Sequence, residues 1–171
     1  PLISALKFLE HEKLVEAKPR RGYFVRLFNE TEMIAIFELR EVLEGLAARR
    51  AATHITDKEC LKLKKIFEPF STEEPITDIA AYSKADKKFH TLITSISSRE
   101  FLAAMLQTFN VISLAYQYAD REGLILHPDE TIQDHIQITR AICSRDPGKA
   151  EQLMRGHFKA AISILKEKIN A

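Results

Sequence analysis

Long stretches of this 171-residue chain contain neither glycine nor proline, and this feature constrains the fold more than any other. The longest such stretch covers residues 76–122. Because glycine and proline are the residues that most often interrupt regular structure, their absence favours helix. Apolar residues make up 46% of the chain, which is enough for a full core. No apolar run approaches the ~18 residues of a membrane span, and no signal peptide is visible.

Apolar spacing and capping residues predict an all-α fold, an antiparallel bundle of about six helices with short connections. Asn29 or Thr31 can cap the first of these helices, and Thr56 opens the second with a capping box to Glu59. Cys60 and Cys143 lack CxxC spacing and are interpreted as reduced thiols of a cytosolic protein. The predicted helices cover residues 30–53, 57–67, 78–96, 99–121, 128–144 and 147–169, with a loop at residues 68–77.

Residues 1–28 form a basic segment ahead of this helical body. They hold six basic and three acidic side chains, a net charge of +3, which leaves −2 for residues 29–171 of a chain whose total is +1. A predicted helix is followed by strands at residues 14–17 and 23–27, joined by the basic turn Lys18–Gly22. This order is that of the second half of a winged helix, which binds DNA. A solvated hairpin with incidental arginines is the alternative.

Four side chains of the helical body are candidates for one metal site. Asp86 and His90 lie one turn apart on one helix face, beside the apolar Phe89. His135 and His157 each stand 11 residues from Asp146, where the last two helices turn back. Both histidines then lie ~16 Å from that turn and side by side. A surface hydrogen bond for the Asp-His pair, and buried structural histidines, remain the alternatives.

Three imidazoles and one carboxylate suit a divalent transition metal. With neutral histidines, the ion and Asp86 leave a local charge of about +1, and a six-coordinate ion keeps two open positions. Such a site would attract an anionic small molecule, and a carboxylate is the class expected.

Two parts of the sequence resemble the GntR family of transcription regulators. Residues 1–15 are similar to the family's recognition helix, and Lys18–Val25 is similar to its wing. Ile3 and Ser4 stand where the family pattern has Arg and Glu, and Lys13 replaces a glycine. The resemblance implies that the first part of the winged helix precedes residue 1. It also implies that operator DNA is contacted by Ser4, Lys7, Arg20, Arg21 and Gly22.

Residues 30–170 resemble the FCD effector domain of the FadR branch of that family. The similarity lies in Arg40–Glu44, in Asp86–His90, in Asp134–Ile136, and in Asp146–Ala150 with Met154 and His157. It divides the chain into a partial DNA-binding domain, residues 1–28, and an effector domain, residues 29–171. It implies a metal held by Asp86, His90, His135 and His157.

The metal implied is zinc first, with nickel, manganese or iron as alternatives. Arg40 would reach the effector, although an ion pair with Glu44 is an equal alternative. Asn110 and Tyr116 would face the same pocket. A cytoplasmic homodimer without membrane contact is expected.

Three functions are compatible with these features. The first is a transcription regulator, without enzymatic activity, that senses a metabolite. The second is a metal-dependent hydrolase or another metalloenzyme, although the sequence has no HExxH motif and no paired Glu-x-x-His. The third is a closed structural metal site in a dimerisation module.

Overall fold

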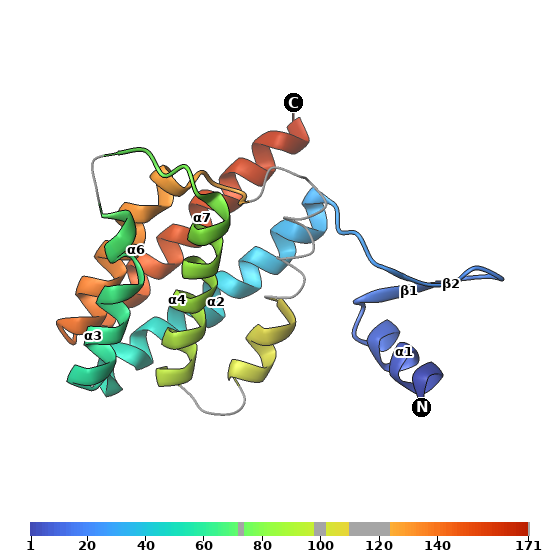
Figure 1. Cartoon of the computed structure of the whole chain (residues 1–171), viewed down its shortest axis with the longest axis horizontal. Helices are drawn as coiled ribbons and strands as arrows, with labels where there is room; N and C mark the ends of the chain where they lie inside the picture. The colour runs from blue at the N-terminus through green and yellow to red at the C-terminus, as the bar shows by residue number, and fades with distance from the viewer. Residues whose placement is uncertain (72–73, 98–101, 110–123, 171) are drawn as a thin grey trace.

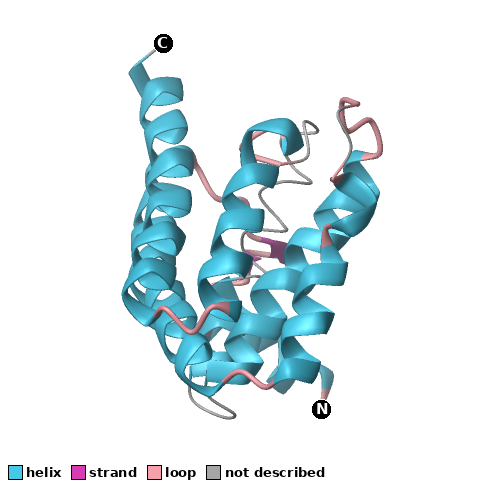
Figure 2. Cartoon of the chain, turned by 90° about the vertical axis from the view of Figure 1, so that its left-hand side faces the viewer, coloured by secondary structure: helices cyan, strands magenta, loops and turns pink. Residues whose placement is uncertain are grey.

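The computed structural model describes residues 1–71, 74–97, 102–109 and 124–170, most of them in helices (Figure 1). Seen from the side, the helices of the body stand next to one another as a bundle (Figure 2), and the predicted antiparallel helical bundle is confirmed. Only residues 102–109 of the helix predicted at 99–121 are described, and they are helical. The elements are α1 (Leu2–His11), β1 (Val15–Lys18), β2 (Gly22–Val25), α2 (Glu30–His54), α3 (Asp57–Ile66), the 3-10 turn η1 (Glu68–Phe70), α4 (Ile79–Ser97), α6 (Pro128–Cys143) and α7 (Pro147–Asn170).

The long helices α2 and α7 form the centre of the bundle and pack along each other. α2 contributes small side chains, Ala47, Ala48, Ala51 and Ala52, which are completely buried. Gly45 shows how closely the helices approach, since a Cβ atom there would lie 2.8 Å from Cγ of Arg155 on α7. α4 and α6 pack against α2, and α3 packs against α4 and α6.

The turn between α6 and α7 follows from its sequence. Arg145 adopts a left-handed conformation (φ 56°), and its N–H donates to the Ile142 carbonyl at 3.0 Å. The N–H of Asp146 donates to Ala141 at 3.0 Å, which completes a Schellman motif. The Asp146 carboxylate then accepts from the N–H of Lys149 at 2.9 Å and caps α7. The predicted helical hairpin is therefore closed by local interactions at both helix ends.

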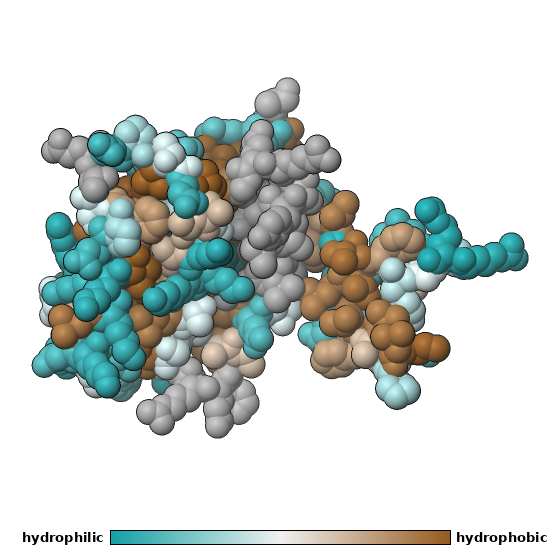
Figure 3. All heavy atoms as spheres, viewed as in Figure 1, coloured by the Kyte–Doolittle hydropathy of each residue, from teal (hydrophilic) through white to brown (hydrophobic). Residues whose placement is uncertain are grey.

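The basic segment has the predicted order of helix, strand, turn and strand. β1 and β2 pair antiparallel, with Val15 opposite Val25 and Lys18 opposite Gly22. α1 contains no buried residue, and Figure 3 shows apolar side chains gathered on this part of the molecule. Leu2 is 73% exposed and Phe8 is 63% exposed. Among the described helices, none combines the length and the apolarity that a membrane span requires.

The side chain of Glu32 connects this segment to α2. Asn29, rather than Thr31, caps α2, and Glu32 returns a hydrogen bond to the Asn29 N–H at 3.1 Å. The same Glu32 pairs with Arg26, which follows β2. Glu32 therefore holds both the start of α2 and the segment that follows the β1–β2 hairpin.

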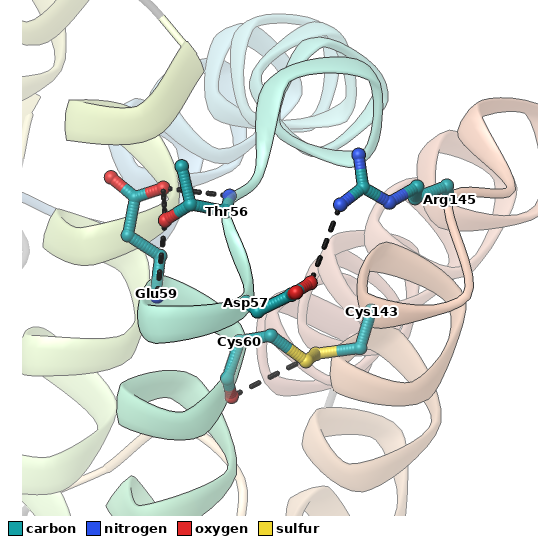
Figure 4. The surroundings of a disulfide bond; sticks show 6 residues. All are labelled: Thr56, Asp57, Glu59, Cys60, Cys143 and Arg145. Carbon is teal, nitrogen blue, oxygen red and sulfur yellow. Dashed lines mark hydrogen bonds and ion pairs between the residues drawn. A yellow bond between two sulfur atoms is a disulfide. The ribbon is translucent and has the colours of Figure 1, made fainter.

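The prediction of reduced thiols is wrong, because the structure joins Cys60 to Cys143 in a disulfide (Figure 4). The two cysteines are separated by 83 positions in sequence, but their Cα atoms lie 5.5 Å apart. Sequence spacing gave no sign of this, since packing of α3 on α6 brings them together. The bond connects the first turns of α3 to the last turn of α6.

Candidate metal and effector site

Three helices bring four potential metal ligands to one point in the bundle. α4 supplies Asp86 and His90, α6 supplies His135, and α7 supplies His157. One ligand atom from each of the four lies within 4.8 Å of all the others. The three histidines are buried, whereas the Asp86 side chain is 25% exposed. The cluster therefore has a buried imidazole side and a carboxylate at its edge.

The proximity of His135 and His157 agrees with the expectation from their equal distances to the α6–α7 turn. Their ring centroids lie 4.7 Å apart. His90 lies next to both, with ring centroids 5.8 Å from His135 and 5.6 Å from His157. The helical hairpin therefore determines the position of two ligands, and the packing of α4 adds the third imidazole.

Each of these histidines has a polar partner at Nδ1, on the side of the ring away from Nε2. Nδ1 of His90 contacts the Glu44 carboxylate, and Nδ1 of His157 lies 3.4 Å from Asp134 Oδ2. Nδ1 of His135 lies 2.9 Å from the Tyr82 hydroxyl. In a neutral imidazole, an acceptor at Nδ1 fixes the proton there and leaves the Nε2 lone pair for a metal, which is the usual arrangement around metal-bound histidines.

A chain of hydrogen bonds assigns the tautomer of His135. The Pro128 carbonyl can only accept, so Thr131 donates to it at 3.3 Å and must accept from the Tyr82 hydroxyl at 2.8 Å. Tyr82 in turn accepts from Nδ1–H of His135. Burial raises the pKa of Tyr82, which keeps the hydroxyl proton in place.

Nε2 of His135 therefore carries a lone pair, is completely buried and has no hydrogen-bond partner among the residues that the structure describes. It lies 3.2 Å from Oδ1 of Asp86, which also carries lone pairs. Two such atoms repel each other unless a cation or a proton lies between them. Metal–ligand bonds of about 2.1 Å place neighbouring ligand atoms about 3 Å apart, so the spacing fits a shared metal ion.

Buried charges alternate along a line that leads from α2 to the cluster. Arg40 pairs with Glu44 at 2.7 Å, and Glu44 pairs with His90. Although burial opposes its ionisation, Arg40 and His90 lower the pKa of Glu44 to about 2. Burial alone would lower the pKa of His90, but Glu44 and Asp86 outweigh it and raise that pKa to about 9. Burial lowers the pKa of His135 to about 4, so this imidazole is neutral at pH 7.

A cavity of about 50 Å³ opens beside the cluster. Since one water needs about 10–15 Å³, there is room for a few groups of that size. Arg40 lines this cavity, so the ion pair with Glu44 and the approach to an effector are compatible. The Arg40 guanidinium lies 4.7 Å from the Phe158 ring centroid, which holds it against an aromatic face. The other predicted effector contacts, Asn110 and Tyr116, lie outside the described residues.

The predicted DNA contacts lie apart from the cluster, on the basic segment. Ser4 and Lys7 are exposed on α1. Arg20 and Arg21 are exposed in the turn between β1 and β2, and the following Gly22 has φ 91°. Figure 3 shows hydrophilic side chains at the protruding end of this segment.

Sequence reasoning missed the residues that orient the histidines. Glu44 was considered only as an ion-pair partner of Arg40, and Tyr82 and Thr131 were not considered. A usable signal for Glu44 was its place on the alanine-rich face that α2 buries. Asp134 stands next to His135 in sequence but contacts His157, which only the packing of α6 on α7 reveals.

Residues 35–160 match the sequence profile of a family described as "FCD domain". The chain is 26% identical over 176 residues to the HTH-type transcriptional repressor GlaR of Escherichia coli K12, covering 98% of this chain and 79% of the relative. It is 33% identical over 130 residues to the HTH-type transcriptional repressor NanR of Salmonella newport, and the match covers 74% of this chain and 49% of the relative. Among solved structures, E. coli McbR/YncC superposes with a TM-score of 0.74 at 18% sequence identity. The match covers 97% of this chain and 79% of that structure's chain.

Metal binding should release a proton from His90. Its pKa of about 9 keeps this imidazole protonated at pH 7, and an ion bound at Nε2 must displace that proton. We expect about one proton released per Zn²⁺ bound at pH 7, and an affinity that rises about tenfold between pH 7 and pH 8. Calorimetry in two buffers of different ionisation enthalpy measures the number of protons released per Zn²⁺ bound. Heats that do not depend on the buffer would contradict it.

Replacing Glu44 with Gln should weaken metal binding without removing a ligand. The variant loses the carboxylate that accepts from Nδ1–H of His90, and such changes typically cost 10–100-fold in metal affinity. The matched control is Glu38→Gln, on the same helix but with an exposed side chain. Competition with a coloured chelator measures both affinities, and equal values for the two variants would disprove the role of Glu44.

Proposed function

We propose, from the premise that this chain belongs to the FCD domain family of GntR-type transcription regulators, that its helical body senses a small carboxylate through a bound metal ion. Its relatives regulate transcription, and the chain is accordingly a regulator and not an enzyme. The metal, the effector class and the assignment to the FadR branch are parts of the proposal. Operator DNA is the partner that its relatives, which are named transcriptional repressors, indicate.

The observation that carries the metal is the pair of facing lone pairs on His135 Nε2 and Asp86 Oδ1. A proton could bridge them only on His135, whose pKa burial lowers to about 4, or on Asp86. Although burial opposes the ionisation of Asp86, His135 and His90 hold its pKa well below the usual range, so neither atom carries that proton at pH 7. A divalent ion satisfies both atoms, and Nε2 of His90 and of His157 complete the set. Three nitrogens and one oxygen favour zinc, with nickel, manganese or iron as alternatives.

The charge around the ion supports an anionic effector. Arg40 and Glu44 cancel, so a divalent ion with its one carboxylate ligand, Asp86, carries about +1 once His90 has lost its proton, while Asp134 lies outside the ligand set, beside His157. The cavity beside the cluster is lined by both Arg40 and His157. A carboxylate there can bind an open position of the ion with one oxygen and accept from Arg40 with the other. The aromatic wall of Phe37 and Phe158 leaves room for a short apolar remainder.

α2 is the element through which the effector would act on DNA binding. Glu44 on α2 contacts a metal ligand, and Glu32, ~18 Å nearer the start of the same helix, pairs with Arg26 at the end of the wing. A shift of α2 on effector binding would therefore move the wing. A cytoplasmic homodimer is also part of the proposal. In such a dimer, the shift of α2 would change the spacing of the two DNA-binding segments. The effector acts only by its different affinity for the two arrangements.

The first test of this function removes two ligands from the full-length protein. We expect His135→Ala together with His157→Ala to abolish stoichiometric metal binding and the response of operator binding to carboxylates. The control is His54→Ala, an exposed histidine at the end of α2. Elemental analysis and gel-shift titrations provide the measurements. Unchanged metal content would refute the site, whereas metal loss with an intact carboxylate response would refute only the effector assignment.

The second test concerns the wing. Arg20→Ala with Arg21→Ala should weaken binding of full-length protein to every DNA sequence alike, because phosphate contacts carry no base information. The slope of log affinity against log salt should become shallower by about one for each arginine that binds a phosphate in the unchanged protein. Arg140→Ala, an exposed arginine of the helical body, is the control. Weakening confined to one operator sequence would contradict phosphate binding.

A further inference from the structure

The disulfide lies between the same two parts of the chain that meet at His135. Cys143 ends α6, and His135 lies on that helix about two turns before it. Cys60 lies in α3, and Phe67 directly follows the last residue of α3. The Phe67 ring stacks flat on the His135 imidazole, with centroids 4.5 Å apart and an interplanar angle of 7°. α3 is therefore joined to α6 by the disulfide, and Phe67, the residue after α3, contacts the imidazole of the candidate metal ligand His135.

We propose that Cys60 and Cys143 form a reversible redox site for hydroperoxides, and that the oxidised bridge holds Phe67 against His135 and tightens metal binding. The second half of this proposal rests on the metal site proposed above, and the first half does not. Both cysteines are partly buried rather than enclosed, so a small oxidant can reach them. Neither has a place in the metal cluster.

The positions of the two thiols assign their roles in the reaction. Cys60 is the fourth residue of α3, close to the positive end of the helix dipole, which favours its thiolate. The sulfur of this thiolate bonds to one oxygen of the hydroperoxide as the O–O bond breaks, which gives a sulfenic acid, and the other oxygen takes a proton from solvent and leaves as an alcohol or water. The Cys143 thiol then attacks the Cys60 sulfur and forms the disulfide, and the sulfenic hydroxyl leaves with the thiol proton as water. Two electrons pass from the two sulfurs to one peroxide, and a dithiol reductant reverses the change.

The bridge adds a covalent link to the packing of α3 on α6. Among the contacts drawn in Figure 4, Asp57 and Arg145 form an ion pair across this junction at 3.4 Å, and both side chains are more than half exposed. Exposed ion pairs of this kind contribute little. When the bridge opens, α3 can shift on α6, and Phe67 then holds the ring plane of His135 less firmly. Since that plane sets the direction of Nε2, the reduced protein should bind metal more weakly.

The experiment compares oxidised and reduced full-length protein. After one equivalent of hydrogen peroxide, the thiols of Cys60 and Cys143 should both be lost, and dithiothreitol should restore them. The Zn²⁺ affinity of the oxidised form should be about tenfold higher than that of the reduced form. This lies within the range by which residues that contact metal ligands change metal affinity. Cys143→Ser should form a sulfenic acid at Cys60, which a dimedone probe traps.

The variant Cys60→Ser with Cys143→Ser is the control, since it cannot form the bridge but retains every metal ligand. It should bind Zn²⁺ like the reduced protein, with or without peroxide. Thiols that persist after peroxide would overturn the redox site. Equal affinities of the two forms, or the same peroxide effect in the double variant, would overturn the coupling. If no form binds Zn²⁺, the metal site and the coupling both fail, while the thiol count still decides the redox site.

Discussion

The contact between Glu44 and His90 is the interaction on which the site depends. A carboxylate buried on the alanine-rich face of α2 would cost several kcal/mol if it stood alone. It is stabilised by Arg40 on one side and by His90 on the other, so α2 and α4 must pack in one register. That register also orients the His90 ring, with Nε2 toward the other ligands. One buried charge therefore connects the packing of the bundle to the geometry of the cluster.

The same helix connects the cluster with the basic segment. α2 is held at its start by Glu32, which caps the helix and binds Arg26, and along its length by close packing on α7. An element that is rigid between two such contacts transmits a displacement instead of absorbing it. In the proposed regulator, a small displacement beside the metal would therefore pass along α2 to the wing. No separate pathway of coupled residues is required.

How much of the site the sequence could predict depends on how local each feature is. His135 and His157 were placed side by side correctly, because both distances are counted along helices from one turn whose caps are local. Asp86 and His90 share a face for the same reason. Glu44, Tyr82 and the disulfide were missed or misread, since each joins helices far apart in sequence, and helical periodicity does not say which helices become neighbours. Asn110 and Tyr116 remain predictions.

The sequence by itself determined the helices, their capped ends, the antiparallel hairpin of α6 and α7 and the two pairs of ligands, because these follow from residue spacing and local hydrogen bonds. Only the tertiary structure decided that the two pairs meet at one point. It also decided that Nε2 of His90 and of His135 faces Asp86, and that Cys60 reaches Cys143. The physical reason is that these features depend on the close packing of side chains between helices, where Gly45, the alanines of α2 and the ring of Phe67 set distances that no periodicity records.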